Sequence, residues 1–161
     1  WSETQGYSGI TDNKKFSWTD YKFSIDGSKS NFSKYNSTDK LKELKSSDDA
    51  ASVTQSTCKM PTKANIEELT ANTTSTWETL NGVNGRRFTS KTNGNSIFVP
   101  AAGDCSGGSL NGAGTGGYYW SSSVYESYSR LAWSLYFNSD NVSLNNNNRY
   151  CGQSVRAVKD K

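Results

Sequence analysis

Hydrophobic side chains recur at every second position in the last third of the chain, with polar residues or tyrosine between most of them. Side chains of a β-strand point alternately to its two faces, so this period indicates strands. A Ser-Asp turn separates two such runs, and residues 132–144 are therefore predicted to form an antiparallel hairpin with one buried face. The positions expected to supply that face are Trp133, Leu135, Phe137, Val142 and Leu144.

Further strands are predicted on both sides of a glycine-rich stretch. Residues 87–90 and 96–99 flank an Asn-Gly turn, and Pro100 ends the second strand because proline lacks the N–H needed in a ladder. Residues 118–121 and 154–158 are also predicted strands. The Asn-Gly pairs at 81–82 and 84–85 are predicted turns, and the stretch 103–117 a surface loop.

Helical patterns precede these strands. Thr62 is the expected N-cap of a helix over residues 63–71, with Ile66 and Leu69 facing inward. Ser47 is the expected N-cap of a shorter helix. Residues 1–47 carry scattered aromatic rings without a sustained period and are predicted to be irregular, with Leu41 and Leu44 on a short helical turn.

This order of elements predicts an α+β fold, with two short helices packed on antiparallel sheets and a strand-rich C-terminal half. The 161 residues suit one domain over residues 1–161. Only 32% of residues are hydrophobic, but 12% are aromatic, and large rings can fill a core with few residues.

The composition excludes several classes of function. The net charge is +3 and the basic residues are scattered, so nucleic acid is not an expected partner. No apolar run is long enough for a membrane helix, and no signal segment is seen. The chain has no histidine, which removes the commonest catalytic base and metal ligand. We therefore predict no catalytic residue, metal or cofactor.

The three cysteines, Cys58, Cys105 and Cys151, have no metal-ligand spacing. Their number allows one disulfide with one free thiol, or three free thiols. The asparagine tract 145–148 offers amide oxygens, but calcium prefers several carboxylates among its ligands, so a calcium site is not supported.

Several longer motifs resemble the bacterial family called the Fibrobacter succinogenes major paralogous domain. The resemblance runs from about Trp1 to Asp160 and implies a C-type lectin-like fold, which formylglycine-generating enzymes share. The family's own activity is poorly defined, so the resemblance speaks to fold more than to function. The motifs that carry it are Asp48-Asp49-Ala50-Ala51, Met60-Pro61-Thr62-Lys63, Asn81-Gly82-Val83-Asn84-Gly85, the run from Asn93 to Gly103, Tyr119-Trp120-Ser121-Ser122 and Ser154-Val155-Arg156-Ala157-Val158.

Residues 119–158 also resemble the variable region of proteins diversified by a diversity-generating retroelement. Such systems misincorporate bases opposite template adenines, and the usual targets are the asparagine codons AAC and AAT. Changing their first two bases gives Tyr, Ser, Cys, Arg, Leu and others, but never Trp, Lys, Glu, Gln or Met. Residues of the reachable kind occupy the positions expected to face outward, which are Tyr128, Arg130, Leu131, Ser134, Tyr136, Ser143, Tyr150 and Cys151. Asn145 and Asn147 match unaltered template residues.

The resemblance implies a recognition surface on a stable scaffold. Tyrosine supplies rigid contact area, and Ser and Asn supply adaptable hydrogen bonds, as in antibody loops. We expect Tyr128, Arg130, Leu131, Ser134, Tyr136, Ser143, Asn145, Asn147, Tyr150 and Cys151 to bind an unidentified protein or glycan. The protein is expected to be a monomer, secreted or displayed on a bacterium or a phage particle. The alternatives are a constant adhesive or structural surface domain and, less favoured, an enzyme of the formylglycine-generating type.

Overall fold

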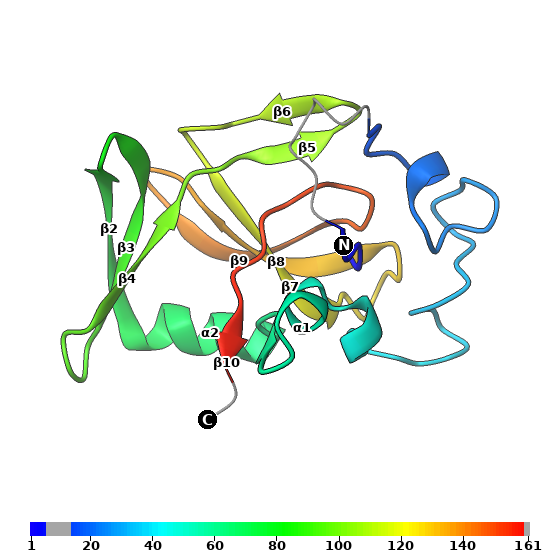
Figure 1. The fold of residues 1–161 in the computed structure, drawn as a ribbon, viewed down its shortest axis with the longest axis horizontal. Helices are drawn as coiled ribbons and strands as arrows, with labels where there is room; N and C mark the ends of the chain where they lie inside the picture. The colour runs from blue at the N-terminus through cyan, green and yellow to red at the C-terminus, as the bar shows by residue number, and fades with distance from the viewer. Residues whose placement is uncertain (6–13, 160–161) are drawn as a thin grey trace.

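The computed structural model describes residues 1–5 and 14–159, in which short helices accompany antiparallel sheets (Figure 1). The predicted α+β class is confirmed at this level. The helical elements are η2 (Trp18–Asp20), η3 (Ser46–Asp48), α1 (Ala50–Thr54) and α2 (Lys63–Asn72). The strands are β1 (Cys58–Lys59), β2 (Thr73–Leu80), β3 (Val83–Ser90), β4 (Ser96–Pro100), β5 (Asp104–Ser106), β6 (Ser109–Asn111), β7 (Gly117–Val124), β8 (Leu131–Phe137), β9 (Val142–Asn148) and β10 (Val158–Lys159).

Four antiparallel sheets are formed by the described strands. The sheets β2-β3-β4 and β7-β8-β9 have three strands each, and β5-β6 is a two-stranded hairpin. The fourth sheet pairs β1 with β10, which brings the C-terminal end of the described chain beside a strand that precedes α2 (Figure 1). Among the described residues, no helix combines the length and apolar character needed to cross a membrane.

The helix α2 begins where the sequence predicts. Thr62 is its N-cap: the Thr62 hydroxyl accepts from the Asn65 backbone N–H, and the Asn65 side chain accepts from the Thr62 N–H. This reciprocal pair satisfies donors that the first turn leaves free. Ile66 is buried and Leu69 packs beside it, as expected.

The cap of α1 differs from the prediction. Asp49, not Ser47, caps this helix, because its carboxylate accepts from the N–H groups of Ala51 and Ser52. The same carboxylate also accepts from the Met60 N–H, so it ties the helix to the segment before α2. A carboxylate can accept several such bonds at once, which a serine hydroxyl cannot do as well.

The turn predicted at Asn81-Gly82 is confirmed, since both residues have positive φ angles of 51° and 81° between β2 and β3. The turn predicted at Asn84-Gly85 is wrong. Gly85 lies inside β3, paired with Glu78 and Pro100, and a Cβ there would overlap the backbone of Val99 and the ring of Phe98. This glycine serves close packing rather than a turn.

The observed strand pairing corrects the predictions for residues 103–117 and 154–158. The stretch 103–117 is not only a loop, because it contains the hairpin β5-β6, turned by Gly107 and Gly108 with φ angles of 58° and 83°. The strand predicted over 154–158 is shorter: Ser154 makes one bridge to Tyr119, and β10 begins only at Val158.

The hydrophobic core has two parts. One cluster includes Trp1, Tyr35, Met60, Trp120 and Ala132, and the other surrounds α2 and the sheet β2-β3-β4. Both clusters take side chains from the sheet β7-β8-β9. Leu135 and Phe137 join the second cluster, and Trp120 and Ala132 on the other face join the first, so that face is covered at one end of the sheet. The second cluster consists of Ile66, Phe88, Val99, Ala101, Tyr119, Leu135 and Phe137.

The described residues before α1 are largely irregular and anchored by rings, as predicted, and residues 6–13 of that prediction lie outside the described part of the chain. Phe16, Tyr21, Phe32 and Tyr35 are buried. The helical turn expected at Leu41 and Leu44 is absent, because Glu43 makes an antiparallel bridge with Ser123, although both leucines do pack against the core. Backbone pairing with the end of β7 decides the conformation there.

Arg149 is the side chain that fixes this segment to the rest of the molecule. It is fully buried, and its guanidinium donates to the carbonyls of Lys34, Tyr35 and Ser129 and to the Tyr21 hydroxyl. The same group lies over the ring of Phe32, at 4.6 Å from its centroid. The polar character of residues 145–149 predicts that none of them lies in the core, and this prediction is wrong for Arg149.

Candidate ligand-binding surface

The sheet β7-β8-β9 carries the central residues of the predicted binding surface. The register pairs Tyr136 with Ser143 and Ser134 with Asn145, and it pairs Ala132 with Asn147. Directly opposed residues of antiparallel strands share a face, and so do alternate residues of one strand. The predicted residues Ser134, Tyr136, Ser143, Asn145 and Asn147 therefore lie on one face of the sheet.

The opposite face carries the side chains that the fold requires. Leu135 and Phe137 are buried there, and Val142 and Leu144 pack against the same cluster beside α2. The alternation predicted from the sequence thus separates two sets of side chains for most of β8 and β9. Val142, Leu144 and Trp133 are all half-buried, but Trp133 is the expected core position that belongs to neither buried cluster.

The predicted residues on this face differ in their exposure to solvent. Asn145 is exposed, and Tyr136, Ser143 and Asn147 are half-buried. Ser134 is buried, which contradicts its expected outward position. Its side chain is short and lies on the central strand between Trp120 and Asn145, so larger neighbours cover it.

Tyr136 is held in place by its neighbours. Its ring contacts that of Tyr118 across β7 and β8, with 4.9 Å between centroids, and its hydroxyl accepts from the Asn138 side chain. An aromatic side chain fixed in this way offers contact area at a small cost in conformational entropy.

A row of aromatic rings lies at the β7–β8 turn, beyond the end of this face. Tyr128 is 55% exposed, and its ring stacks on that of Tyr125 with an interplanar angle of 11°. Tyr125 contacts Trp133 edge to face, and the Arg130 guanidinium lies 5.0 Å from the Tyr128 centroid. Tyr125 was not predicted as a neighbour of Tyr128. A turn between two predicted strands is the signal that could have indicated it, because both residues lie in the connection from β7 to β8.

A cleft of about 560 Å³ gathers three further predicted residues, Arg130, Leu131 and Tyr150. Its other wall comes from the N-terminal segment, with Trp18 and Lys29. Tyr150 and Trp18 contact each other edge to face, 4.9 Å between centroids. We call this the aromatic cleft. The sequence offered no signal for Trp18 and Lys29, because they are more than a hundred positions away along the chain.

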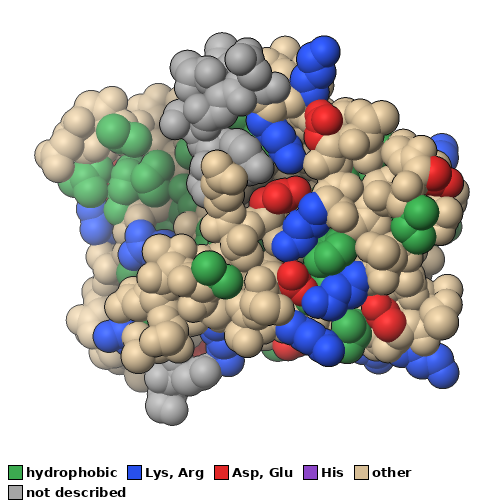
Figure 2. Space-filling view, turned by 45° about the vertical axis from the view of Figure 1, so that its right-hand side comes forward, with side chains coloured by type: hydrophobic (Ala, Val, Ile, Leu, Met, Phe, Trp, Pro, Cys, Tyr) green, Lys and Arg blue, Asp and Glu red, His purple; other side chains and the backbone are tan. Residues whose placement is uncertain are grey.

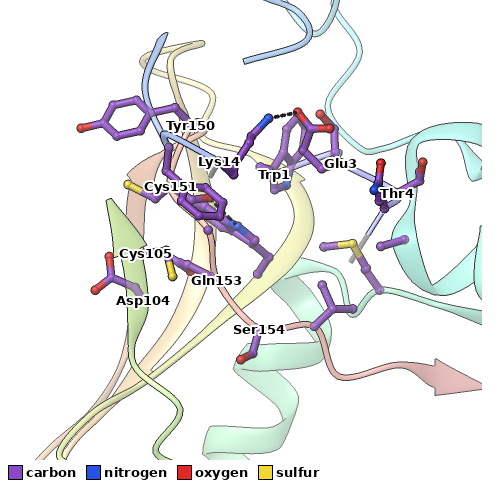
Figure 3. Close-up of a pocket in the computed structure, with 18 of the residues that line it drawn as sticks. Trp1, Glu3, Thr4, Lys14, Asp104, Cys105, Tyr150, Cys151, Gln153 and Ser154 are labelled. Atoms are coloured by element: carbon purple, nitrogen blue, oxygen red, sulfur yellow. Dashed lines mark hydrogen bonds and ion pairs between the residues drawn. The ribbon is translucent and has the colours of Figure 1, made fainter. Parts of the chain in front are cut away.

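Cys151, the last predicted residue, does not face the surface. It is buried and lines a second pocket, of about 670 Å³, together with Trp1, Asp104 and Cys105 (Figure 3). The chain turns inward after Tyr150, because Cys105 and Gly152 form an antiparallel bridge. The amide atoms of Gln153 are also buried beside this pocket, and they have no hydrogen-bond partner among the residues that the structure describes.

The thiols are poorly suited to nucleophilic chemistry. All three cysteines are unpaired and buried. Burial raises the pKa of the Cys151 thiol to about 11 and also raises the pKa of Cys105. The thiolate is the reactive form, so both groups are protonated and inert at neutral pH. Within residues 1–5 and 14–159, no cluster of three Cys, Asp or Glu side chains is arranged to hold a metal ion.

The visible charges are mixed on the face that Figure 2 shows. Lys and Arg side chains alternate there with Asp and Glu, without a large area of one sign. This distribution matches the near balance of 18 basic and 15 acidic residues. The charges visible on this face therefore produce no long-range field of one sign.

Comparisons with known proteins identify a family without a described activity. Residues 57–158 match the model of a family described as a domain of unknown function, DUF8237. Neither the curated proteins nor the solved structures provide a match. The matched region runs from β1 into β10 and contains α2, the β2-β3-β4 and β7-β8-β9 sheets, and most of the predicted surface. The match covers more than half of the chain, and the chain therefore belongs to the DUF8237 family.

Proposed function

We propose that this protein is a non-enzymatic ligand-binding protein whose recognition surface is diversified by a retroelement, carried on a C-type lectin-like scaffold. Its partner is a protein or glycan met outside the cell, at a bacterial surface or on a phage particle. The observation that carries the proposal is the separation of the two sets of side chains along β8 and β9.

That separation matters because diversification must not destroy the fold. Tyr136, Ser143 and Asn145 share the accessible face, while Leu135 and Phe137 fill the core behind them. Substitution on the first set changes what a ligand touches, and the buried hydrophobic area that stabilises the sheet stays intact. The combination of short helices with antiparallel sheets supports a C-type lectin-like scaffold but is not specific to it.

Burial refines the set of binding residues. Ser134 and Cys151 are enclosed, so we remove them from the contact surface. The remaining proposed contacts are Tyr128, Arg130, Leu131, Tyr136, Ser143, Asn145, Asn147 and Tyr150.

The test is deep sequencing of this gene across its source population, together with the flanking DNA. We expect substitutions to concentrate at Tyr128, Arg130, Tyr136, Ser143 and Tyr150, beside a near-copy template with adenines in those codons. At the buried Ser134 and Cys151, surviving variants should carry only small residues. Leu135 and Phe137 are the internal controls and should not vary.

An even distribution of substitutions, with no template copy, would contradict diversification. The chain would then be better described as a constant surface domain with a fixed ligand. Turnover of a substrate that disappears on replacing Cys58 or Cys105 would instead indicate an enzyme.

A further inference from the structure

The aromatic cleft combines two cations with aromatic walls. Lys29 reaches it from the N-terminal segment and Arg130 from the β7–β8 turn, and no acidic side chain lines it among the described residues. In the described part of the chain, neither cation has an ion-pair partner, and the Arg130 guanidinium lies over the ring of Tyr128. Two cations without a counter-charge beside a concave surface favour an anionic ligand.

The walls of the cleft limit the shape of that ligand. The rings of Trp18 and Tyr150 meet at 79°, so they form a corner with one apolar side on each ring. The cleft volume of about 560 Å³ lies within the range of small-molecule sites. Asn148 and Ser17 add amide and hydroxyl groups at its edge, which can bond to neutral polar groups such as sugar hydroxyls.

We propose that the aromatic cleft binds a carboxylated sugar, with the sugar ring against Trp18 and Tyr150 and its carboxylate between Arg130 and Lys29. The guanidinium fork suits a carboxylate because it can donate two parallel hydrogen bonds. An aspartate or a C-terminal carboxylate of a peptide carries the same charge, but a saturated ring fits a corner of two aromatic faces better than an extended chain does. This inference deepens the ligand-binding function proposed above and rests on it.

The two walls of the cleft come from different parts of the sequence. Trp18 and Lys29 lie before the region expected to vary, whereas Arg130, Asn148 and Tyr150 lie inside it. Substitution in the region 119–158 would therefore reshape one wall and leave the other unchanged. The constant wall would keep the cation of Lys29 and the rings of Phe16 and Trp18 in every variant, and the variable wall would adjust the fit.

The experiment is a titration of the folded chain with D-glucuronate, followed by ¹⁵N-resolved NMR of the Trp18 indole and the Arg130 Nε–H. D-Glucose, inorganic phosphate and an acetylated aspartyl peptide are titrated in parallel. We expect glucuronate to shift both signals, with weaker binding at higher salt because screening reduces charge attraction. Arg130→Gln and Lys29→Gln should each weaken glucuronate binding by about tenfold, the loss typical of one charge-assisted hydrogen bond.

Lys40→Gln is the matched control, since Lys40 is an exposed lysine of the same N-terminal segment that does not line the cleft. It should leave the affinity unchanged. Unchanged melting temperatures of all three variants would show that a loss of binding is not a loss of fold.

Three results would overturn the proposal. Equal binding of glucose and glucuronate would remove the role of charge, and equal binding of phosphate would indicate a general anion site. Stronger binding of the peptide would assign the carboxylate to a protein ligand. None of these results affects the sequencing test of diversification, so the two proposals fail separately.

Discussion

The central guanidinium carbon of Arg149 lies 4.6 Å from the centroid of the Phe32 ring, although the two residues are far apart in the sequence. The same group also lies 5.1 Å from the ring centroids of Trp1 and Tyr21. Arg149 thus occupies a site lined by aromatic rings, where a hydrophobic side chain would be usual, and its N–H groups donate hydrogen bonds to backbone carbonyls. This contact fixes the N-terminal segment beside β9 and so positions the constant wall of the aromatic cleft.

Replacement of Arg149 should therefore destabilise the whole domain. Arg149→Met keeps the approximate volume but leaves the buried carbonyls of Lys34 and Tyr35 without donors. We expect the free energy of unfolding to fall by about 3 kcal/mol or more. Urea denaturation followed by tryptophan fluorescence measures it. Arg156→Met, at an exposed arginine, is the control and should change stability by less than about 0.5 kcal/mol.

The tyrosines of the predicted surface should differ in their effect on stability. Tyr128 is mostly exposed, so Tyr128→Ser should cost less than about 1 kcal/mol. Tyr150 packs against Trp18 and the first core cluster, so Tyr150→Ser should cost about 2 kcal/mol. Paired urea curves compare the two variants. Equal losses would mean that Tyr150 is not packed as described, and that both residues are free surface positions.

Acid should weaken the contact between the N-terminal segment and η3, which Asp48 makes. Burial by itself raises the pKa of this carboxyl, but hydrogen bonds from Lys34, Tyr35 and Lys22 outweigh it and hold the pKa below its usual value. The unfolded chain therefore binds the proton at higher pH than the folded chain. The stabilisation is complete above the ordinary aspartate pKa of about 4 and is lost as pH falls through the lower folded value.

The corresponding variant is Asp48→Asn. It should lower the free energy of unfolding by about 2 kcal/mol at pH 7 and flatten the decline in stability below about pH 4. Urea denaturation at a series of pH values follows both effects. Asp140→Asn, at an exposed turn, serves for comparison and should preserve the wild-type profile; an unchanged profile in Asp48→Asn would refute the role of this carboxylate.

The cysteines should be slow to react in the folded protein. Cys58, Cys105 and Cys151 are buried, and the pKa of Cys151 is raised to about 11 by burial. Alkylation with iodoacetamide at pH 8, followed by mass spectrometry, should label none of them quickly. In urea all three should be modified at ordinary thiol rates. Rapid labelling of Cys105 or Cys151 in the native state would reveal an activated thiol and revive the enzyme alternative.

Local patterns were sufficient for much of the fold. The cap at Thr62 and the inward positions of α2 depend only on residues within a few positions of each other, and so does the alternation of β8. The strand β2 was not predicted, because its threonine-rich sequence lacks a regular hydrophobic period. β2 pairs with β3 over the full length of both strands, and this pairing stabilises β2 although its side chains show no strand pattern.

The alternation of side chains along β8 and β9 can be read from the amino-acid sequence alone, because strand geometry assigns successive residues to opposite faces. The lack of histidine is equally plain from the composition. Packing between distant segments, in contrast, covers Ser134 and Cys151, places Arg149 in the core, and brings Lys29 and Trp18 into a cleft with Arg130 and Tyr150. These outcomes depend on contacts between segments far apart in the chain, and such contacts leave no periodic trace in the local sequence.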